Sequence, residues 1–212
     1  MTDQTTATTS ETYRDRLRLR ILHAAKRIIR AEGLQAVQAR RVAKDAECSV
    51  GTLYNIFGEI DDLLMAVNSD TLGDLGRHLT ATLEQVAGEP LIDRLMALAN
   101  TYLEFAVAHR RRWRAIFEHV LPEKKQRPPS FLTDRTRLLA LIEDQLAELV
   151  PEPGPRADAA RALFASVHGI VQLSLDGRLG AVSTNDCERH IRFVVELVIG
   201  GLRTRADTQP TP

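Results

Sequence analysis

Apolar residues recur at helical spacing along almost the whole chain, and no segment shows the alternating pattern of a β-strand. Pro and Gly accumulate between the apolar segments, as in the run Pro151, Pro153, Gly154 and Pro155. The chain is therefore predicted to be all-α. The helices expected after residue 60 cover residues 61–86, 91–109, 111–120, 130–149, 155–178 and 184–204.

Three further helices are predicted in the first sixty residues. The first has a continuous apolar stripe and ends at Gly33; the stripe comprises Leu17, Ile21, Ala24, Ala25 and Ile28. The second, over residues 39–46, has an apolar face of Ala39, Val42, Ala43 and Ala46 and a basic face of Arg40, Arg41 and Lys44. A brief turn at Glu47 and Cys48 precedes the third. Two short helices joined in this way predict a helix-turn-helix, whose second helix enters the major groove of DNA.

The third helix follows Ser49, which is placed to cap it by accepting a backbone N–H of its first turn. Its buried face is predicted to hold Leu53, Ile56 and Phe57. Its outer face then presents Val50, Gly51, Thr52, Tyr54 and Asn55. Gly51 allows a close approach to a ligand, and the polar side chains can reach base edges or phosphates.

Residues 14–64 resemble the DNA-binding domain of the TetR family of bacterial transcriptional regulators. The matching positions are Gly33, Arg40, Val42, Ala43, Ser49, Gly51, Thr52, Leu53, Tyr54, Phe57, Asp61, Asp62 and Leu63. The resemblance implies that Thr52, Tyr54 and Asn55 face the groove. Candidate DNA-binding residues are therefore Arg40, Arg41, Lys44, Ser49, Gly51, Thr52, Tyr54 and Asn55.

The chain departs from the family pattern at four positions. Ile60 replaces a phosphate-binding Lys, which implies one contact fewer and a weaker salt dependence of DNA binding. Ile56 replaces an aromatic residue or His. Glu47 occupies a left-handed turn position that favours Gly, at a cost of roughly 1 kcal/mol, and Gln38 replaces a capping Ser or Thr. These departures imply either altered operator contacts or loss of specific DNA binding.

The remainder resembles the regulatory domain of the same family, in the type named for a Trp, a His and a Gly. Phe164, His168 and Gly169 match this type, with Phe in place of Trp and an implied roomier pocket. In such regulators a small molecule binds between the helices. Candidate ligand contacts are Tyr102, Phe105, Trp113, Phe117 and His168; each could instead be a core residue, and His168 a hydrogen-bonded core histidine.

The last two predicted helices carry apolar stripes suited to a partner helix, and Gly200 and Gly201 would permit close contact. In the family, these helices pair in a four-helix dimer interface, which places two DNA-contacting helices about 34–36 Å apart. The candidate interface residues are Leu175, Ile191, Val195, Val198 and Leu202. An ordinary monomer core is the alternative.

Charge agrees with a basic DNA-binding domain followed by an acidic body. Residues 1–57 hold ten Lys or Arg and six Asp or Glu, whereas the rest holds 18 and 22. The arginines at 14, 16, 18 and 20 are either a solvated helix face or part of a flexible arm that enters the minor groove.

The sequence has few features of a membrane protein, a secreted protein, a metalloprotein or an enzyme. There is no apolar run near 18 residues and no signal peptide, so we expect a soluble cytoplasmic protein. The six His show no metal-binding spacing, and no catalytic or nucleotide-binding motif is present, so no metal, cofactor or enzyme activity is expected. Cys48 is interpreted as a half-buried packing residue, with a redox-sensitive thiol as the alternative.

The predicted organisation is a disordered tail at 1–12, a helix-turn-helix DNA-binding domain at 13–60, a helical ligand-binding and dimerisation domain at 61–204, and a disordered tail at 205–212. The expected function is that of a homodimeric transcriptional regulator, a repressor that leaves a palindromic operator when a small-molecule effector binds. The alternative is a family member that has lost specific DNA binding and acts through a protein partner.

Overall fold

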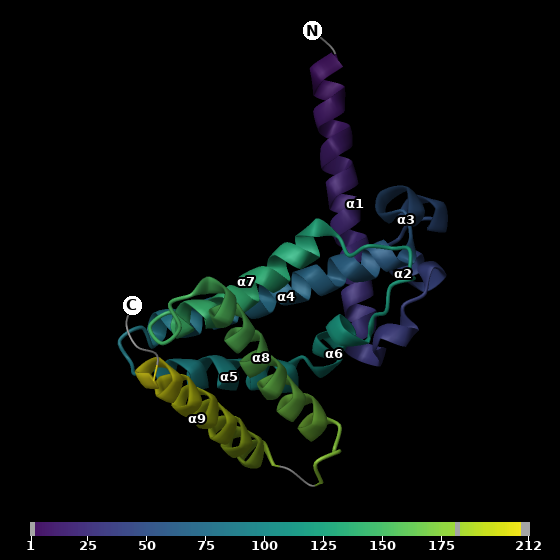
Figure 1. The fold of residues 1–212 in the computed structure, drawn as a ribbon. Coiled ribbons are helices and arrows are strands. Elements are labelled where there is room, and N and C mark those ends of the chain that lie inside the picture. The colour runs from purple at the N-terminus through teal and green to yellow at the C-terminus, as the bar shows by residue number, and fades with distance from the viewer. Residues whose placement is uncertain (1–2, 181–182, 209–212) are drawn as a thin grey trace. The chain divides into compact units, whose positions relative to one another are not determined.

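The computed structural model of the chain describes residues 3–180 and 183–208. Over these residues the chain is all-α, as predicted (Figure 1). The elements are α1 (Asp3–Glu32), the 3-10 helix η1 (Leu34–Ala36), α2 (Ala39–Asp45), α3 (Val50–Phe57), α4 (Ile60–Gln85), α5 (Leu91–Ala108), α6 (Arg110–Glu118), α7 (Pro129–Leu146), α8 (Pro153–Leu175) and α9 (Thr184–Thr208).

The largest differences from the sequence prediction lie at the two ends. A disordered tail is predicted over residues 1–12, but α1 already begins at Asp3, and no Gly or Pro interrupts the polar residues that follow. At the other end α9 continues to Thr208. Residues 209–212 of the predicted C-terminal tail lie outside the described part of the chain.

The chain divides into two compact units. Unit 1 comprises Met1–Leu72 and His109–Leu132, and unit 2 comprises Gly73–Ala108 and Thr133–Pro212. Unit 1 thus contains α6 in addition to the helix-turn-helix, and α4 contributes residues to both units. The boundary predicted between residues 60 and 61 separates a DNA-binding from a ligand-binding domain and does not coincide with the limits of the compact units. It stays a prediction.

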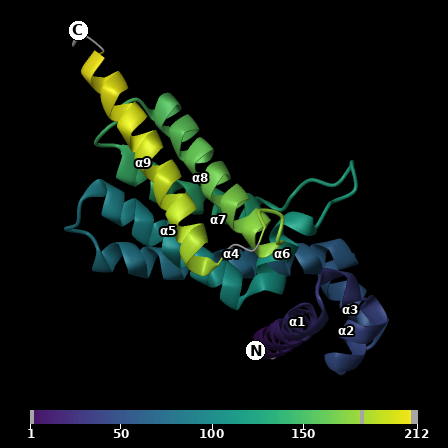
Figure 2. The same ribbon diagram turned by 90° about the horizontal axis from the view of Figure 1, so that it is seen from below.

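The core of unit 1 forms where the apolar stripe of α1 packs against α2, α3 and α6. Ile21, Ala24 and Ala25 on α1 are completely buried, as are Val42 on α2 and Leu53 on α3. Both ribbon views show α2 and α3 beside α1 (Figures 1 and 2). The apolar positions that predict the helix-turn-helix therefore meet in one cluster, with the exception of Ala39.

The turn between α2 and α3 is fixed by backbone geometry and one side-chain cap. Glu47 has a φ of 52°, the left-handed conformation expected at this position. The Ser49 hydroxyl accepts the backbone N–H of Thr52 at 3.0 Å, which confirms the predicted cap of α3. Gln38 makes no side-chain cap at the start of α2, also as expected. The turn is therefore specific but strained at one residue.

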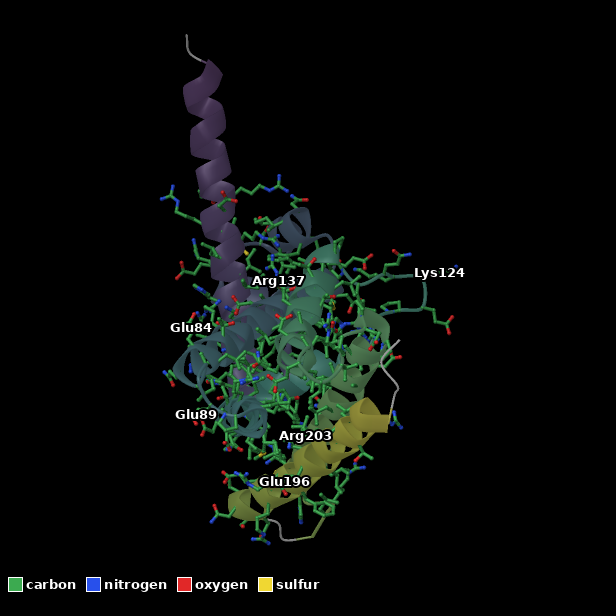
Figure 3. All side chains as sticks on the ribbon, turned by 60° about the vertical axis from the view of Figure 1, so that its left-hand side comes forward. Glu84, Glu89, Lys124, Arg137, Glu196 and Arg203 are labelled. Atoms are coloured by element: carbon green, nitrogen blue, oxygen red, sulfur yellow. The ribbon has the colours of Figure 1, made fainter. Side chains whose placement is uncertain are left out.

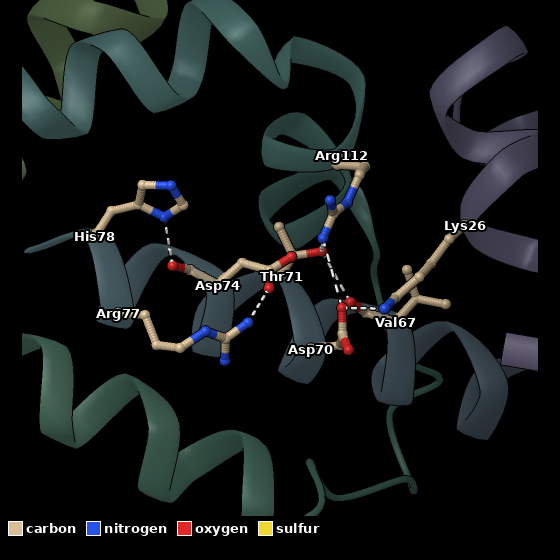
Figure 4. Close-up of polar contacts among 8 residues, drawn as sticks. All are labelled: Lys26, Val67, Asp70, Thr71, Asp74, Arg77, His78 and Arg112. Carbon is tan, nitrogen blue, oxygen red and sulfur yellow. Dashed lines mark hydrogen bonds and ion pairs between the residues drawn. The ribbon is translucent and has the colours of Figure 1, made fainter. Parts of the chain in front are cut away.

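A half-buried carboxylate joins three helices of unit 1. Asp70 on α4 forms one ion pair with Lys26 on α1 and another, at 3.5 Å, with Arg112 on α6 (Figure 4). Arg112 also reaches the hydroxyl of Thr71 at 3.4 Å. Nearby, the buried Asn68 side chain donates to the carbonyl of Ala115 at 3.2 Å. These contacts tie the first half of α4 to α1 and α6.

Unit 2 is a helical bundle in which α9 packs against both α5 and α8. Figure 2 shows α8 and α9 running side by side. Its buried residues come from all three helices and include Tyr102, Leu163, Val171, Ile191, Val195 and Ile199. Arg94 on α5 adds a polar link to α7, because its guanidinium donates to Gln145 at 2.8 Å and pairs with Glu148 at 3.1 Å.

Truncation of the α1 stripe tests the packing of unit 1. We expect Ile21→Ala to lower the free energy of unfolding by about 2–5 kcal/mol, because it leaves a cavity at a fully buried position. Leu19 lies on the same helix but is 53 % exposed, so Leu19→Ala should change it by less than about 0.5 kcal/mol. Urea denaturation of both variants measures the difference; equal effects would contradict the assigned stripe.

The strain at Glu47 gives a second test. Glu47→Gly should be more stable than Glu47→Ala by about 1 kcal/mol, because only Gly adopts a positive φ without steric cost. Both variants lose the exposed ion pair with Arg20, so this loss cancels in the comparison. Thermal or urea unfolding measures the difference, and an advantage for Ala would show that the turn is not left-handed.

Candidate functional site

The outer face of α3 presents the side chains predicted to contact DNA. Gly51, Tyr54 and Asn55 are exposed, while Leu53 and Phe57 on the opposite face are buried. Thr52 is half-buried, and its hydroxyl lies 2.8 Å from that of Ser49, which is already occupied as the cap. The helix can therefore present polar side chains to DNA, and Gly51 lets the DNA come close to its backbone, while the buried face stays packed.

The three basic residues of α2 are placed differently. Arg40 and Lys44 are exposed. Arg41 forms two hydrogen bonds with the carboxylate of Glu32 on α1, one of 2.7 Å from Nη1 and a shorter one from Nη2. This bonding raises the pKa of Arg41 and lowers that of Glu32. Arg41 thus joins α1 to α2, and Arg40 and Lys44 are the freer cations for a phosphate.

The arginines at 14, 16, 18 and 20 belong to the middle of α1 and not to a flexible arm. Arg14 donates to the carbonyl of Asn55 at 3.3 Å, and the Arg18 guanidinium lies 4.5 Å from the centre of the Phe57 ring. Both partners are in the last turn of α3, where unpaired carbonyls favour a cation. The four-residue spacing of Arg14 and Arg18 could have predicted this shared face.

Arg20 has a related role at the start of the turn. Its guanidinium donates to the carbonyl of Ala46 at 2.6 Å and to the Glu47 carboxylate at 2.9 Å. The positioning roles of Arg14, Arg18 and Arg20 were not predicted from the sequence, because the charge of each arginine does not show that its side chain reaches α3 or the turn before it.

Two of the departures from the family pattern have a packing role. Ile56 and Ile60 are both half-buried against the unit 1 core. Cys48 packs against the same cluster, and burial raises the pKa of its thiol. These observations agree with the interpretation of Cys48 as a packing residue, since a raised pKa leaves little thiolate at neutral pH.

The candidate ligand contacts are divided between the two units. Tyr102, Phe105 and His168 belong to unit 2, whereas Trp113 and Phe117 belong to unit 1. Trp113 is completely buried beside Phe117, with ring centres 5.4 Å apart, and Phe117 is 42 % exposed. Phe105 is buried, and its ring lies 5.7 Å from that of His78. The five residues are therefore not one cluster within either unit.

Tyr102 and His168 do meet in unit 2. The Tyr102 hydroxyl lies 2.7 Å from Nδ1 of His168, and the His168 ring stacks on Phe164 at 5.7 Å. The rings of Tyr102 and Phe164 lie edge to face at 5.9 Å. Burial lowers the pKa of His168, so the neutral imidazole is favoured at neutral pH. Phe164 thus takes part in an aromatic cluster with two of the predicted residues.

Unit 2 also has a groove of about 410 Å³ between α5 and α9. None of the predicted ligand contacts lines it. Its lining is mostly polar and consists of Met96, Asn100, Asn185, Glu188, Arg189 and Arg192. The side-chain oxygen of Asn100 is buried without a hydrogen-bond partner in the described part of the chain. No periodic pattern along the chain predicts such a groove, because its residues come from helices far apart in the sequence.

The candidate dimer residues also differ in accessibility. Ile191 and Val195 are buried within unit 2 itself, so packing inside one chain already uses these two side chains. Leu175, Val198 and Leu202 are half-buried. The exposed apolar side chains of α9 are instead Phe193 and Leu197, at 62 % and 59 %. Ile191 and Val195 of the predicted stripe thus face the core, and a neighbouring stripe of α9 faces outward.

Two other kinds of site, a membrane-spanning helix and a metal centre, are absent from the described residues. No helix of residues 3–180 and 183–208 is long and apolar enough to cross a membrane. In the same part of the chain, no group of three or more His, Cys, Asp or Glu side chains is arranged to hold a metal ion.

Solved structures of similar fold cover most of the chain. A protein of unknown function from Rhodococcus sp. RHA1 is 22 % identical, with a TM-score of 0.72 over 88 % of this chain and 95 % of that one. A TetR-family transcriptional regulator from Streptomyces coelicolor is 18 % identical, with a TM-score of 0.66 over 88 % and 99 %. The regulator FadR from Bacillus subtilis, in complex with stearoyl-CoA, is 16 % identical, with a TM-score of 0.65 over 86 % and 98 %.

The sequence patterns of protein families identify the family of the chain, whereas the solved structures show only its fold. No curated protein matches the chain. Residues 21–67 match the pattern of the bacterial regulatory proteins of the tetR family, and residues 95–198 match that of the tetracyclin repressor-like C-terminal domain. The first match contains α2 and α3 and the second contains the Tyr102, Phe164 and His168 cluster. The chain therefore belongs to the TetR family of DNA-binding transcriptional regulators.

Proposed function

We propose that the protein is a homodimeric repressor that binds a palindromic operator through α3 and leaves it when a small molecule binds unit 2. The observation that carries this proposal is the geometry of α3. Its capped first turn and buried Leu53 and Phe57 leave Gly51, Tyr54 and Asn55 exposed together. A rigid helix that presents polar side chains from one face fits the major groove.

The aromatic cluster of unit 2 supports effector binding. Tyr102, Phe164 and His168 combine flat apolar surfaces with a hydroxyl and an imidazole, as small-molecule sites commonly do. Structurally similar regulators have been solved with stearoyl-CoA and, for RolR, with resorcinol. These two ligands differ widely, so the proposal extends to a small organic effector and not to its identity.

Release of DNA requires the effector to bind one conformation of the dimer more tightly than another. Helix α4 contributes residues 60–72 to unit 1 and residues 73–85 to unit 2. A change in unit 2 that shifts the second half of α4 would therefore also shift the first half, where Asp70 binds Lys26 and Arg112. We propose α4 as the element that couples effector and operator.

The exposed stripe of α9 supports a dimer. Phe193 and Leu197 are one helical turn apart, and a Cβ at Gly200 or Gly201 would meet nothing within 4 Å. Large exposed apolar side chains next to glycines suit close packing against a partner helix. The proposed interface thus centres on Phe193 and Leu197, with Leu175, Val198 and Leu202 at its margin.

Selection of genomic DNA fragments by the purified protein tests the proposal. We expect recovery of a few sites that carry an inverted repeat at moderate salt. Thr52→Ala/Asn55→Ala should lose this preference by about 10-fold or more, since each good base contact contributes about 1–3 kcal/mol. Gln85→Ala, an exposed polar residue at the end of α4, serves as the control. Uniform recovery by the unsubstituted protein would refute sequence-specific binding.

The dimer is tested separately by molecular mass in solution. Light scattering should give twice the chain mass for the unsubstituted protein and the single chain mass for Phe193→Glu/Leu197→Glu, because two charges would be buried in the interface. Val107→Glu on α5 introduces a charge at another exposed apolar position and should remain dimeric. A monomeric unsubstituted protein would contradict the proposed dimer.

A further inference from the structure

The α6–α7 loop, defined as residues 119–128, is fastened to the first turn of α4. His119 Nε2 lies 2.8 Å from Oδ1 of Asp61. Lys125 Nζ lies 2.7 Å from Glu59 and 2.8 Å from Asp62. Both the loop and this turn belong to unit 1. Three acidic residues at the start of α4 are therefore each bound by a basic residue of the loop.

This anchoring places the loop close to the end of α3 along the chain. Only Gly58 and Glu59 separate α3 from α4. Hydrogen bonding to Asp62 and Glu59 raises the pKa of Lys125, so its ammonium group stays charged at neutral pH. Because the partners of Lys125 directly follow α3, the loop is held beside the end of the DNA-contacting helix.

The loop itself is a turn with a basic residue at its outer end. The backbone N–H of Lys125 donates to the carbonyl of Pro122 at 2.8 Å, which leaves Glu123 and Lys124 at the centre of the turn. Figure 3 shows Lys124 at the outer end of the loop. Beyond the turn, the Arg127 guanidinium lies 5.4 Å from the ring centre of the buried Phe131. The ring restricts the position of Arg127.

The charges at this corner divide into a paired set, in which three carboxylates outnumber their two basic partners, and a free set. Glu59, Asp61 and Asp62 are paired with Lys125 and His119. Lys124 and Arg127 form no ion pair with any residue of the described ranges, and Glu123 is the one acidic residue of the loop. The free set therefore has a net positive charge, and the fastened turn limits the entropy lost when it meets an anion.

We infer that the α6–α7 loop is a second DNA-contacting element, in which Lys124 and Arg127 bind backbone phosphates next to the groove that α3 enters. The inference rests on the proposed DNA-binding function. Phosphate contacts hold a helix in register without reading sequence. The loop would supply such contacts beside position 60, where the side chain is an isoleucine packed against the core.

The test is a salt titration of DNA affinity. Binding of the selected operator and of an unrelated duplex is measured by fluorescence anisotropy over a range of NaCl concentrations. For Lys124→Ala/Arg127→Ala we expect the slope of log Kd against log salt to fall by about two, near 0.9 for each lost phosphate contact. Affinity for both duplexes should fall by the same factor, because phosphate contacts carry no base specificity.

Two further variants separate this effect from charge and folding. Arg135→Ala/Arg178→Ala removes two exposed cations from unit 2 and should leave the slope unchanged. Lys125→Met should lower the slope as well, because it releases the loop and exposes two carboxylates beside the DNA.

The inference is overturned if the slope of Lys124→Ala/Arg127→Ala equals that of the unsubstituted protein. Equal decreases in the unit 2 control would also overturn it, since net charge would then explain the effect. Failure of the proposed function has a different signature, in which the unsubstituted protein binds operator and unrelated duplex alike. The salt slope on the unrelated duplex still tests the loop in that case.

Discussion

The orientation of α3 depends on burial of the apolar stripe of α1. Helices α2 and α3 contain seven and eight residues, well below the roughly 12–15 at which an isolated helix becomes marginally stable. Their helical state must therefore come from tertiary packing. Ala24 and Ala25 have small side chains and are completely buried, which permits the close approach of neighbouring helices, and Ile21 fills the space beside them.

Most of the charge near α3 maintains its position and is not free for a ligand. Arg14 and Arg20 bind carbonyls at the end of α3 and at the turn, and Arg41 binds Glu32. A count of basic residues therefore overstates the number of DNA contacts that the domain can make. Arg40 and Lys44 are exposed and form no ion pair within the described residues. Some basic residues thus hold α3 and its neighbours in place, whereas Arg40 and Lys44 remain available to attract DNA.

Local patterns predicted the elements, and long-range contacts limited the prediction of the sites. Helical periodicity located the helices within a few residues, and the Ser49 cap and the Glu47 turn followed from local backbone chemistry. Periodicity also identified the stripe of Ile191 and Val195, but it could not tell a face that packs within the chain from one that is exposed. The pairing of Lys125 with Glu59 joins residues 66 positions apart, and no local pattern encodes it.

The two cysteines have a practical consequence for probes of this protein. Cys187 is buried and Cys48 half-buried, and burial raises the pKa of both thiols. Alkylating reagents attack the thiolate, so both native thiols should react slowly at neutral pH. A cysteine introduced at an exposed site would be modified first, and a fluorophore could be attached there without removal of either native residue. The native sequence is thus already suited to distance measurements between the two units in solution.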